Sequence, residues 1–195
     1  MDGVTAGGPG LVAVGHDVQQ AAVWTSPDGV TWSRVPHDEP LGGLRGKMYS
    51  VTAGGRGLVA VGEDLSSNLD DFHDDAAVWT SPDGVTWSRV PHDEAVFGGA
   101  GNQSMKSVTA GGPGLVAVGS DMAFGLSSPG FDAAVWTSLD GLVWLRVPDD
   151  EGVFGGSGTQ VLDGVIVGES GVVAVGHEKL GDDDDAAVWA GAPPD

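Results

Sequence analysis

The chain of 195 residues contains no cysteine, a single tyrosine and only eight lysine and arginine residues. Without cysteine there is no disulfide, no thiolate nucleophile and no zinc site with cysteine ligands. No apolar run approaches the length of a membrane-spanning helix. The N-terminus also lacks a basic segment followed by an apolar stretch, so no signal peptide is predicted, which favours a cytoplasmic location.

Acidic residues outnumber basic ones, 28 to eight, and the formal net charge is −20. A field of this sign repels nucleic-acid phosphates and anionic membranes, so neither partner is expected. It favours cationic partners, either metal ions or basic peptides. A salt-adapted or GC-rich source also produces an acidic, lysine-poor surface, so the charge alone does not identify a ligand.

What the chain does contain is four near-copies of one sequence. They restart after intervals of 47, 57 and 57 residues, at Val4, Val51, Val108 and Val165. Self-similarity at this period predicts a propeller, a solenoid or an array, and the 34 glycines favour short strands and turns over helices. A single domain, 1–195, is therefore divided into the units 1–47, 48–104, 105–161 and 162–195.

Each complete unit holds four strand candidates, which in the second unit are 50–53, 57–61, 76–80 and 85–90. The motif Ser-Pro-Asp-Gly, or Ser-Leu-Asp-Gly, separates the last two and is a strong hairpin signal. The two middle strands are continuously apolar, so both of their faces must be covered. Small sheets stacked face to face around an axis meet this need. The sequence therefore predicts an all-β propeller of four small antiparallel blades.

The fourth unit keeps three strands, the last at 186–189, and then ends in Gly-Ala-Pro-Pro-Asp. Its blade is therefore expected to lack the outer strand. Three interpretations follow. The chain is a monomeric four-bladed ring with one three-stranded blade, half of a homodimer that completes a larger ring, or an excerpt from a longer array.

The turn before the outer strand carries Ser26-Pro-Asp-Gly-Val-Thr-Trp32, with copies that begin at Ser81 and Ser138. It resembles the Asp box of sialidase-type (BNR-repeat) β-propellers, shortened by one residue between Asp and Gly, and covers three of the four units. In that family the box is a folding device. The resemblance implies this structural role for Ser26, Asp28, Trp32, Ser81, Asp83, Trp87, Ser138, Asp140 and Trp144.

Sialidase activity is not expected. Enzymes of that family use three arginines around the axis and a tyrosine nucleophile with an acidic partner. Here Arg34, Arg89 and Arg146 repeat at one outer-strand position, and Tyr49 is the only tyrosine. That catalytic set cannot be assembled from these residues.

Positions that differ between copies indicate a specific site, because the shared positions make the fold. The variable connections join the second strand to the third and each unit to the next, so both lie on one rim. Two residues before each restart the side chains are polar and dissimilar. With two nearby glutamines they form the predicted ligand-facing ring: Asp2, Tyr49, Lys106, Asp163, Gln103 and Gln160.

The loops on this rim are rich in carboxylates, which suit Ca²⁺ as a bound ion. The candidate ligands are Asp71, Asp75, Asp182 and Asp185. No EF-hand spacing is present, so solvated loops are the alternative. His37 and His92 recur in Val-Pro-His-Asp-Glu, which favours a strand-exit turn over catalysis.

Three functions follow from these patterns. The first is a non-catalytic binding module that presents the acidic rim to a cationic peptide, a glycan or Ca²⁺. The second is an enzyme acting on a glycan or small molecule, with acid and base groups drawn from Asp2, Asp163, His16 and His177. The third is a structural fragment of a repeat array without a ligand.

Overall fold

The computed structural model of the chain describes residues 1–18, 20–36, 46–65, 73–112, 114–122, 130–150, 152–155 and 158–191. Within them the chain is all-β, apart from one helical turn, α1 (Glu94–Phe97). The strands of the first two units are β1 (Gly3–Gly7), β2 (Gly10–Asp17), β3 (Gln20–Ser26), β4 (Ser33–Arg34), β5 (Lys47–Gly54), β6 (Gly57–Leu65), β7 (Asp74–Ser81) and β8 (Ser88–Arg89). Those of the last two are β9 (Gln103–Gly111), β10 (Gly114–Asp121), β11 (Asp132–Ser138), β12 (Trp144–Arg146), β13 (Thr159–Gly168), β14 (Gly171–Leu180) and β15 (Asp183–Gly191).

The strands form four antiparallel sheets in sequence order. Three sheets have four strands, β1 to β4, β5 to β8 and β9 to β12, and the last has three, β13 to β15. The predicted all-β class is confirmed, and so are the four small antiparallel sheets. None of the helices in the described part of the chain has the length or apolar character needed to cross a membrane.

Each sheet has two different apolar faces. The tryptophan face carries a valine, an alanine and a tryptophan paired across three strands: Val4, Ala13 and Trp24; Val51, Ala60 and Trp79; Val108, Ala117 and Trp136; Val165, Ala174 and Trp189. The valine face, on the other side, carries Val12, Val14 and Val23; Val59, Val61 and Val78; Val116, Val118 and Val135; Val173, Val175 and Val188. Alanine at the centre of the tryptophan face leaves room for a close neighbouring sheet.

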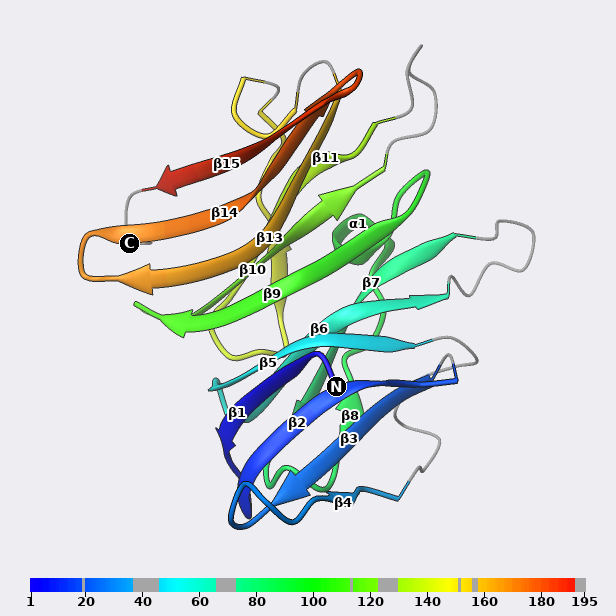
Figure 1. Cartoon of the computed structure of the whole chain (residues 1–195), viewed down its shortest axis with the longest axis vertical. Coiled ribbons are helices and arrows are strands. Elements are labelled where there is room, and N and C mark those ends of the chain that lie inside the picture. The colour runs from blue at the N-terminus through cyan, green and yellow to red at the C-terminus, as the bar shows by residue number, and fades with distance from the viewer. Residues whose placement is uncertain are drawn as a thin grey trace.

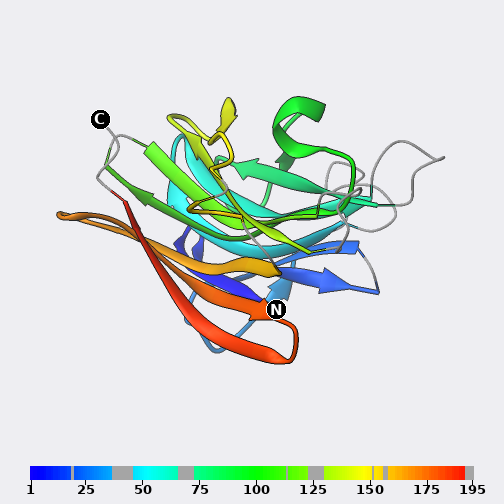
Figure 2. The ribbon, with the colours of Figure 1, turned by 90° about the horizontal axis from the view of Figure 1, so that it is seen from above.

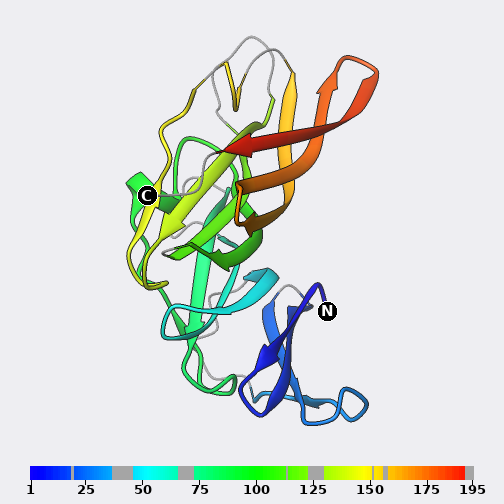
Figure 3. The same ribbon diagram turned by 90° about the vertical axis from the view of Figure 1, so that its left-hand side faces the viewer.

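The sheets stack in series, and one core cluster lies between each successive pair. In every cluster the valine face of one sheet packs against the tryptophan face of the next. Figure 1 shows the order from β1–β4 at the bottom to β13–β15 at the top, and Figure 2 looks down on the stack from the last sheet. Figure 3 shows the first and last sheets at opposite ends, with the other two between them.

The turns before the outer strands repeat one set of hydrogen bonds. In the second unit Asp83 Oδ1 accepts from the backbone N–H groups of Val85 and Thr86 at 2.9 and 2.6 Å, and Ser81 Oγ accepts from Gly84 N at 2.8 Å. Gly84 has φ 79°, a left-handed conformation that favours glycine. The first and third units form the equivalent bonds around Asp28 and Asp140.

An ion pair also recurs on the opposite rim. In the first three units an aspartate at or near the end of the second strand binds the arginine of the fourth strand: Asp17 with Arg34 at 3.0 Å, Asp64 with Arg89 at 3.0 Å, and Asp121 with Arg146. The guanidinium groups of Arg89 and Arg146 lie 5.8 Å from the ring centres of Trp79 and Trp136. This pairing explains why arginine repeats at that position.

The innermost strands of the last three sheets each contain a β-bulge. The residues left without a direct partner are Tyr49, Lys106 and Asp163. Opposite the first bulge, a Cβ added to Gly62 would overlap the carbonyl oxygen of Lys47. Glycine is therefore required at that position because two backbones approach closely.

Candidate functional site

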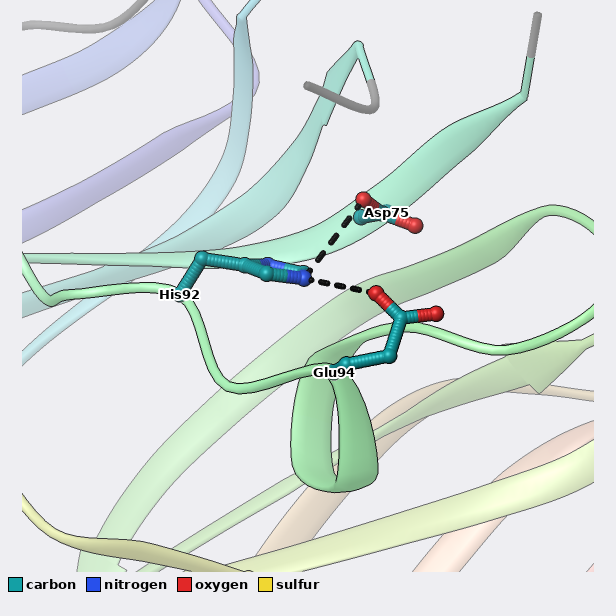
Figure 4. A group of neighbouring side chains, drawn as sticks. All are labelled: Asp75, His92 and Glu94. Carbon is teal, nitrogen blue, oxygen red and sulfur yellow. Dashed lines mark hydrogen bonds and ion pairs between the residues drawn. The ribbon is translucent and has the colours of Figure 1, made fainter. Parts of the chain in front are cut away.

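Among the described residues, one group of acidic and histidine side chains is close enough together to hold a metal ion, and it lies beside the second sheet. It consists of Asp75 on β7, His92 after β8 and Glu94 at the start of α1 (Figure 4). His92 Nε2 lies 3.1 Å from Glu94 Oε2 and 3.8 Å from Asp75 Oδ2. One ligand atom from each of the three residues lies within 4.8 Å of the other two.

Hairpin geometry brings these residues together. β7 and β8 pair with Trp79 opposite Arg89, so continuing the antiparallel register places Asp75 level with residue 93. The chain then enters α1, where Asp93 caps the helical turn by accepting a hydrogen bond from Ala95 N at 3.1 Å. The cap directs His92 and Glu94, on either side of Asp93, toward the start of β7.

The cluster combines a buried carboxylate with two accessible groups. The Asp75 side chain is nearly fully buried, whereas His92 is partly exposed and Glu94 is well exposed. His73 Nε2 lies 3.2 Å from the other carboxylate oxygen of Asp75, which orients that carboxylate with one oxygen toward His92. One imidazole and two carboxylates are a ligand set typical of Zn²⁺ and related ions.

The other units do not repeat this ligand set. In the first unit Gln20 takes the place of Asp75, and in the third unit Asp149 takes the place of His92. Asp149 instead contacts Arg146 at 3.4 Å. The cluster therefore belongs to the variable positions of the repeat.

A second polar cluster forms at the bulges of the inner strands. Glu63 accepts hydrogen bonds from Lys47 Nζ at 2.6 Å and from the Tyr49 hydroxyl at 2.7 Å. Lys106 Nζ lies 3.8 Å from the same carboxylate and 4.3 Å from the centre of the Tyr49 ring. Two predicted ligand-facing residues, Tyr49 and Lys106, are thus in contact with each other and with buried Glu63.

The charges and hydrogen-bonding groups of this second cluster are largely paired with one another. Burial alone would raise the pKa of Glu63, but hydrogen bonds from Lys47 and Tyr49 and the charge of Lys106 lower it overall. Burial raises the pKa of Tyr49, and the hydrogen bond to Glu63 and its charge raise it further. Glu63 is therefore a carboxylate at neutral pH and Tyr49 a neutral phenol, an arrangement that stabilises the junction between the second and third sheets.

The residues proposed for an axial acid–base pair form two separate pairs. His16 Nδ1 lies 3.2 Å from Asp2 Oδ2, and His177 Nδ1 lies 3.0 Å from Asp163 Oδ2. The first pair belongs to the first sheet and the second to the last, with two sheets between them (Figure 1). They are placed equivalently but do not converge on one site.

Several predicted site residues lie elsewhere than expected. Gln103 and Gln160 are buried, so they do not face an open surface. The Gln103 amide donates to Asp121 at 2.7 Å, which explains its burial beside the end of β10. Asp182 and Asp185 are exposed on the last sheet and form no site with Asp75, and Asp71 lies outside the described residues.

His92 and Glu94 were not predicted as candidate metal ligands because the recurrence of Val-Pro-His-Asp-Glu suggested only a strand-exit turn. The hairpin register carried the signal: a four-stranded unit places the segment after its outer strand beside the start of its third strand. Combining that register with the acidic start of the third strand, Asp74-Asp75, identifies the cluster.

An apolar cavity of about 350 Å³ lies between the third and last sheets. It is lined by both sheets, with Val135, Phe154 and Trp189 among its walls. At the two earlier junctions Trp87 and Trp144, which follow the turns that begin at Ser81 and Ser138, fill part of the core. The last sheet has no fourth strand among the described residues, so we interpret the cavity as the space left by that strand.

The sequence matches no protein-family model and no curated protein. The function is therefore inferred from the geometry of the chain itself.

Proposed function

We propose that the chain is a non-catalytic binding module of the β-propeller type that binds a divalent transition-metal ion through Asp75, His92 and Glu94. The observation that carries the proposal is the convergence of these three side chains from β7, the segment after β8 and α1 (Figure 4). The propeller type is supported by four similar sheets that stack in series through equivalent faces. The Asp-box likeness of three turns supports it as well.

The ligand set favours Zn²⁺ over the Ca²⁺ considered from the sequence. Calcium takes six to eight oxygen ligands, whereas an imidazole nitrogen is preferred by zinc, copper, iron and nickel. Three protein ligands leave at least one coordination position for an oxygen of a partner molecule. The net charge of −20 raises the local concentration of any cation near the rim.

Binding is favoured over catalysis by the arrangement of the other candidate groups. The two histidine–aspartate pairs lie on the first and last sheets, away from the metal-ligand cluster on the second. A hydrolytic site would need a further acid or base near the open coordination position. His73, the nearest histidine, is buried and directed at Asp75.

The test is a titration of the metal-free protein with Co²⁺, followed by visible absorption, and with Zn²⁺, followed by calorimetry. We expect one tight site per chain, with d–d bands of a low-coordinate cobalt ion, and much weaker binding of Ca²⁺. His92→Ala and Glu94→Gln should each weaken binding at least tenfold, because each removes or weakens one of three ligands. Both side chains are accessible, so these variants should fold normally.

His16→Ala is the matched control, since His16 is also an exposed histidine paired with a carboxylate. Its zinc affinity should equal that of the wild-type chain. Zinc binding that survives His92→Ala and Glu94→Gln but is lost in His16→Ala would contradict the proposed site. Absence of binding to the wild-type chain would overturn the proposal altogether.

A further inference from the structure

The outward face of the last sheet is apolar and uncovered. Val175 and Val188 on this valine face are 48% and 70% exposed. Val14 and Val23 hold the same positions in the first sheet and are completely buried. The difference arises because the second sheet covers the first, whereas none of the described sheets follows the last (Figure 1).

The opposite end of the stack is also incompletely covered. On the tryptophan face of the first sheet Val4 is 61% exposed and Trp24 is partly exposed, although the small Ala13 between them is buried. In the second sheet Val51 is 7% exposed and Trp79 is fully buried, because the first sheet packs against them. Each end of the stack thus presents one of the two faces that meet inside it.

These two free faces repeat the central residues of the first internal interface, although the last sheet has no described counterpart of Val35, which follows β4 in the first sheet. On the valine side Val173, Val175 and Val188 correspond to Val12, Val14 and Val23. On the tryptophan side Val4, Leu11, Ala13 and Trp24 correspond to Val51, Leu58, Ala60 and Trp79. The residue type is unchanged at each of these seven positions, so the centres of the free faces have shapes that already fit each other within the chain.

The last sheet also resembles the first sheet at a position where two backbones approach closely. At the first internal interface a Cβ on Gly3 would lie 2.9 Å from the Ser50 Cα, so β1 and β5 approach closely where a side chain is absent. The equivalent residue of the last sheet is Gly164, and a Cβ there would meet only its own sheet, at Val175. Gly164 therefore leaves room for the first strand of a neighbouring sheet to approach the last sheet, as β5 approaches β1 at Gly3.

We propose that the polypeptide 1–195 associates head to tail, with the valine face of the last sheet of one copy packed on the tryptophan face of the first sheet of the next. The contact is heterologous, so two copies form a closed ring if the rotation returns to the start, and otherwise longer chains form. Its occupant is a second copy of this chain because that copy supplies a partner face with the same central residues as the internal interface. This inference is independent of the proposed metal site.

The charge of the chain predicts how association depends on salt. Two copies of net charge −20 repel each other, and this repulsion is screened at high ionic strength. The contact itself is apolar and is not weakened by screening. Association should therefore become stronger, not weaker, as sodium chloride is raised from low to physiological concentrations and above.

The test is sedimentation velocity of the wild-type chain and of Val4→Asp and Val188→Asp over a range of concentrations. The wild type should form dimers or larger species, and each variant alone should be monomeric, because a buried unpaired carboxylate opposes docking. An equimolar mixture of the two variants should form a 1:1 dimer. In that mixture the intact last sheet of Val4→Asp can dock on the intact first sheet of Val188→Asp.

Leu145→Asp is the control, because Leu145 is exposed on β12, away from both terminal faces, and receives the same added charge. It should associate as the wild type does. A wild-type chain that stays monomeric in high salt would overturn the proposal and leave both faces to other partners or to further repeats. Dimers that persist in only one of the two face variants would indicate like-with-like pairing and overturn the head-to-tail arrangement.

Discussion

Trp24 and Trp79 occupy the same position in consecutive sheets, and both are paired with an alanine and an arginine of their own sheet. Trp79 is fully buried, whereas Trp24 is partly exposed. The local sequences, Ala-Ala-Val-Trp-Thr-Ser, are identical. The difference shows that burial in this fold is decided by the neighbouring sheet and not by the sheet that carries the residue.

The hydrogen bonds in the turns, in contrast, do not depend on the neighbouring sheet. Asp28 and Asp83 accept the same backbone hydrogen bonds although one lies in the first sheet and the other in the second. These bonds span only two or three residues, so the neighbouring sheet has no part in them. The molecule therefore combines interactions that depend on position in the stack with interactions that do not.

The largest effect is expected from alanine substitutions at Trp79 and Trp24, which test directly whether the neighbouring sheet decides burial. Trp79→Ala empties a filled core site and should lower the free energy of unfolding by about 3–5 kcal/mol. Trp24→Ala removes a half-covered side chain and should cost roughly 1 kcal/mol. Both are measured by urea unfolding in a Val188→Asp background, so that association does not cover Trp24.

Equal losses for the two tryptophans would show that the first sheet is covered in solution as the second is. Circular dichroism of the folded variants is the control, since both should keep the same strand content. A loss at Trp24 larger than that at Trp79 would contradict the stacking order itself.

A smaller effect on stability should appear at the Ser-Pro-Asp-Gly turns, and it should be of similar size in the first and second sheets. Backbone hydrogen bonds from Thr86 and Val85 lower the pKa of Asp83 from its ordinary value of 3.8, and equivalent bonds from Thr31 and Val30 lower that of Asp28. Asp28→Asn and Asp83→Asn keep an acceptor oxygen but remove the charge. We expect similar, modest losses of stability at pH 7, measured by urea unfolding.

The sign of the pH dependence follows from the depressed pKa values. The charged carboxylates stabilise the fold at any pH above about 4, and this contribution is lost as the pH falls through the lower folded-state pKa. The gap between the wild type and either variant should therefore close in acid. Losses that differ clearly between Asp28→Asn and Asp83→Asn, or a gap that does not narrow as the pH falls below about 4, would contradict a purely local role.

The repeat explains how much of the fold could be predicted from the sequence. The continuous apolar strands around Ala60 and Val78 require cover on both faces, and stacked sheets supply it. The Ser-Pro-Asp-Gly turns mark the hairpins, and the three strand candidates of the fourth unit match the three strands described in the last sheet. The sequence alone could not predict that the end faces stay uncovered, because the first and last sheets carry the same residues as the sheets between them.

The site was harder to predict because its residues come from β7, from the segment after β8 and from the start of α1. Asp75 was selected for its acidic surroundings, but its partners His92 and Glu94 were dismissed as a repeated turn. Gln103 was assigned to the ligand-facing ring because it lies near the restart of the repeat, whereas its side chain turns inward to Asp121. Side-chain direction at a bulge depends on which residue is left unpaired, and the sequence does not state this.

The smallest predicted effect is spectroscopic and concerns a position where the four units differ. Tyr49 is the only tyrosine, so its ionisation can be followed by absorbance near 295 nm without interference from another phenol. Burial first, and then the hydrogen bond and charge of Glu63, raise its pKa above the ordinary value of 10.0. The folded chain should show no phenolate at a pH where the urea-unfolded chain is half ionised.

Because the folded-state pKa is raised, neutral Tyr49 stabilises the fold fully below about pH 10, and this contribution is lost as the pH rises. Glu63→Gln removes the charge and should move the ionisation part of the way back, since burial remains. Lys106→Met is the companion variant: it removes the cation over the ring, so the phenolate should become still harder to form. Identical titrations of the folded and unfolded wild type would mean that Tyr49 is not held against Glu63 and Lys106, and that the variable bulge side chains face water instead of each other.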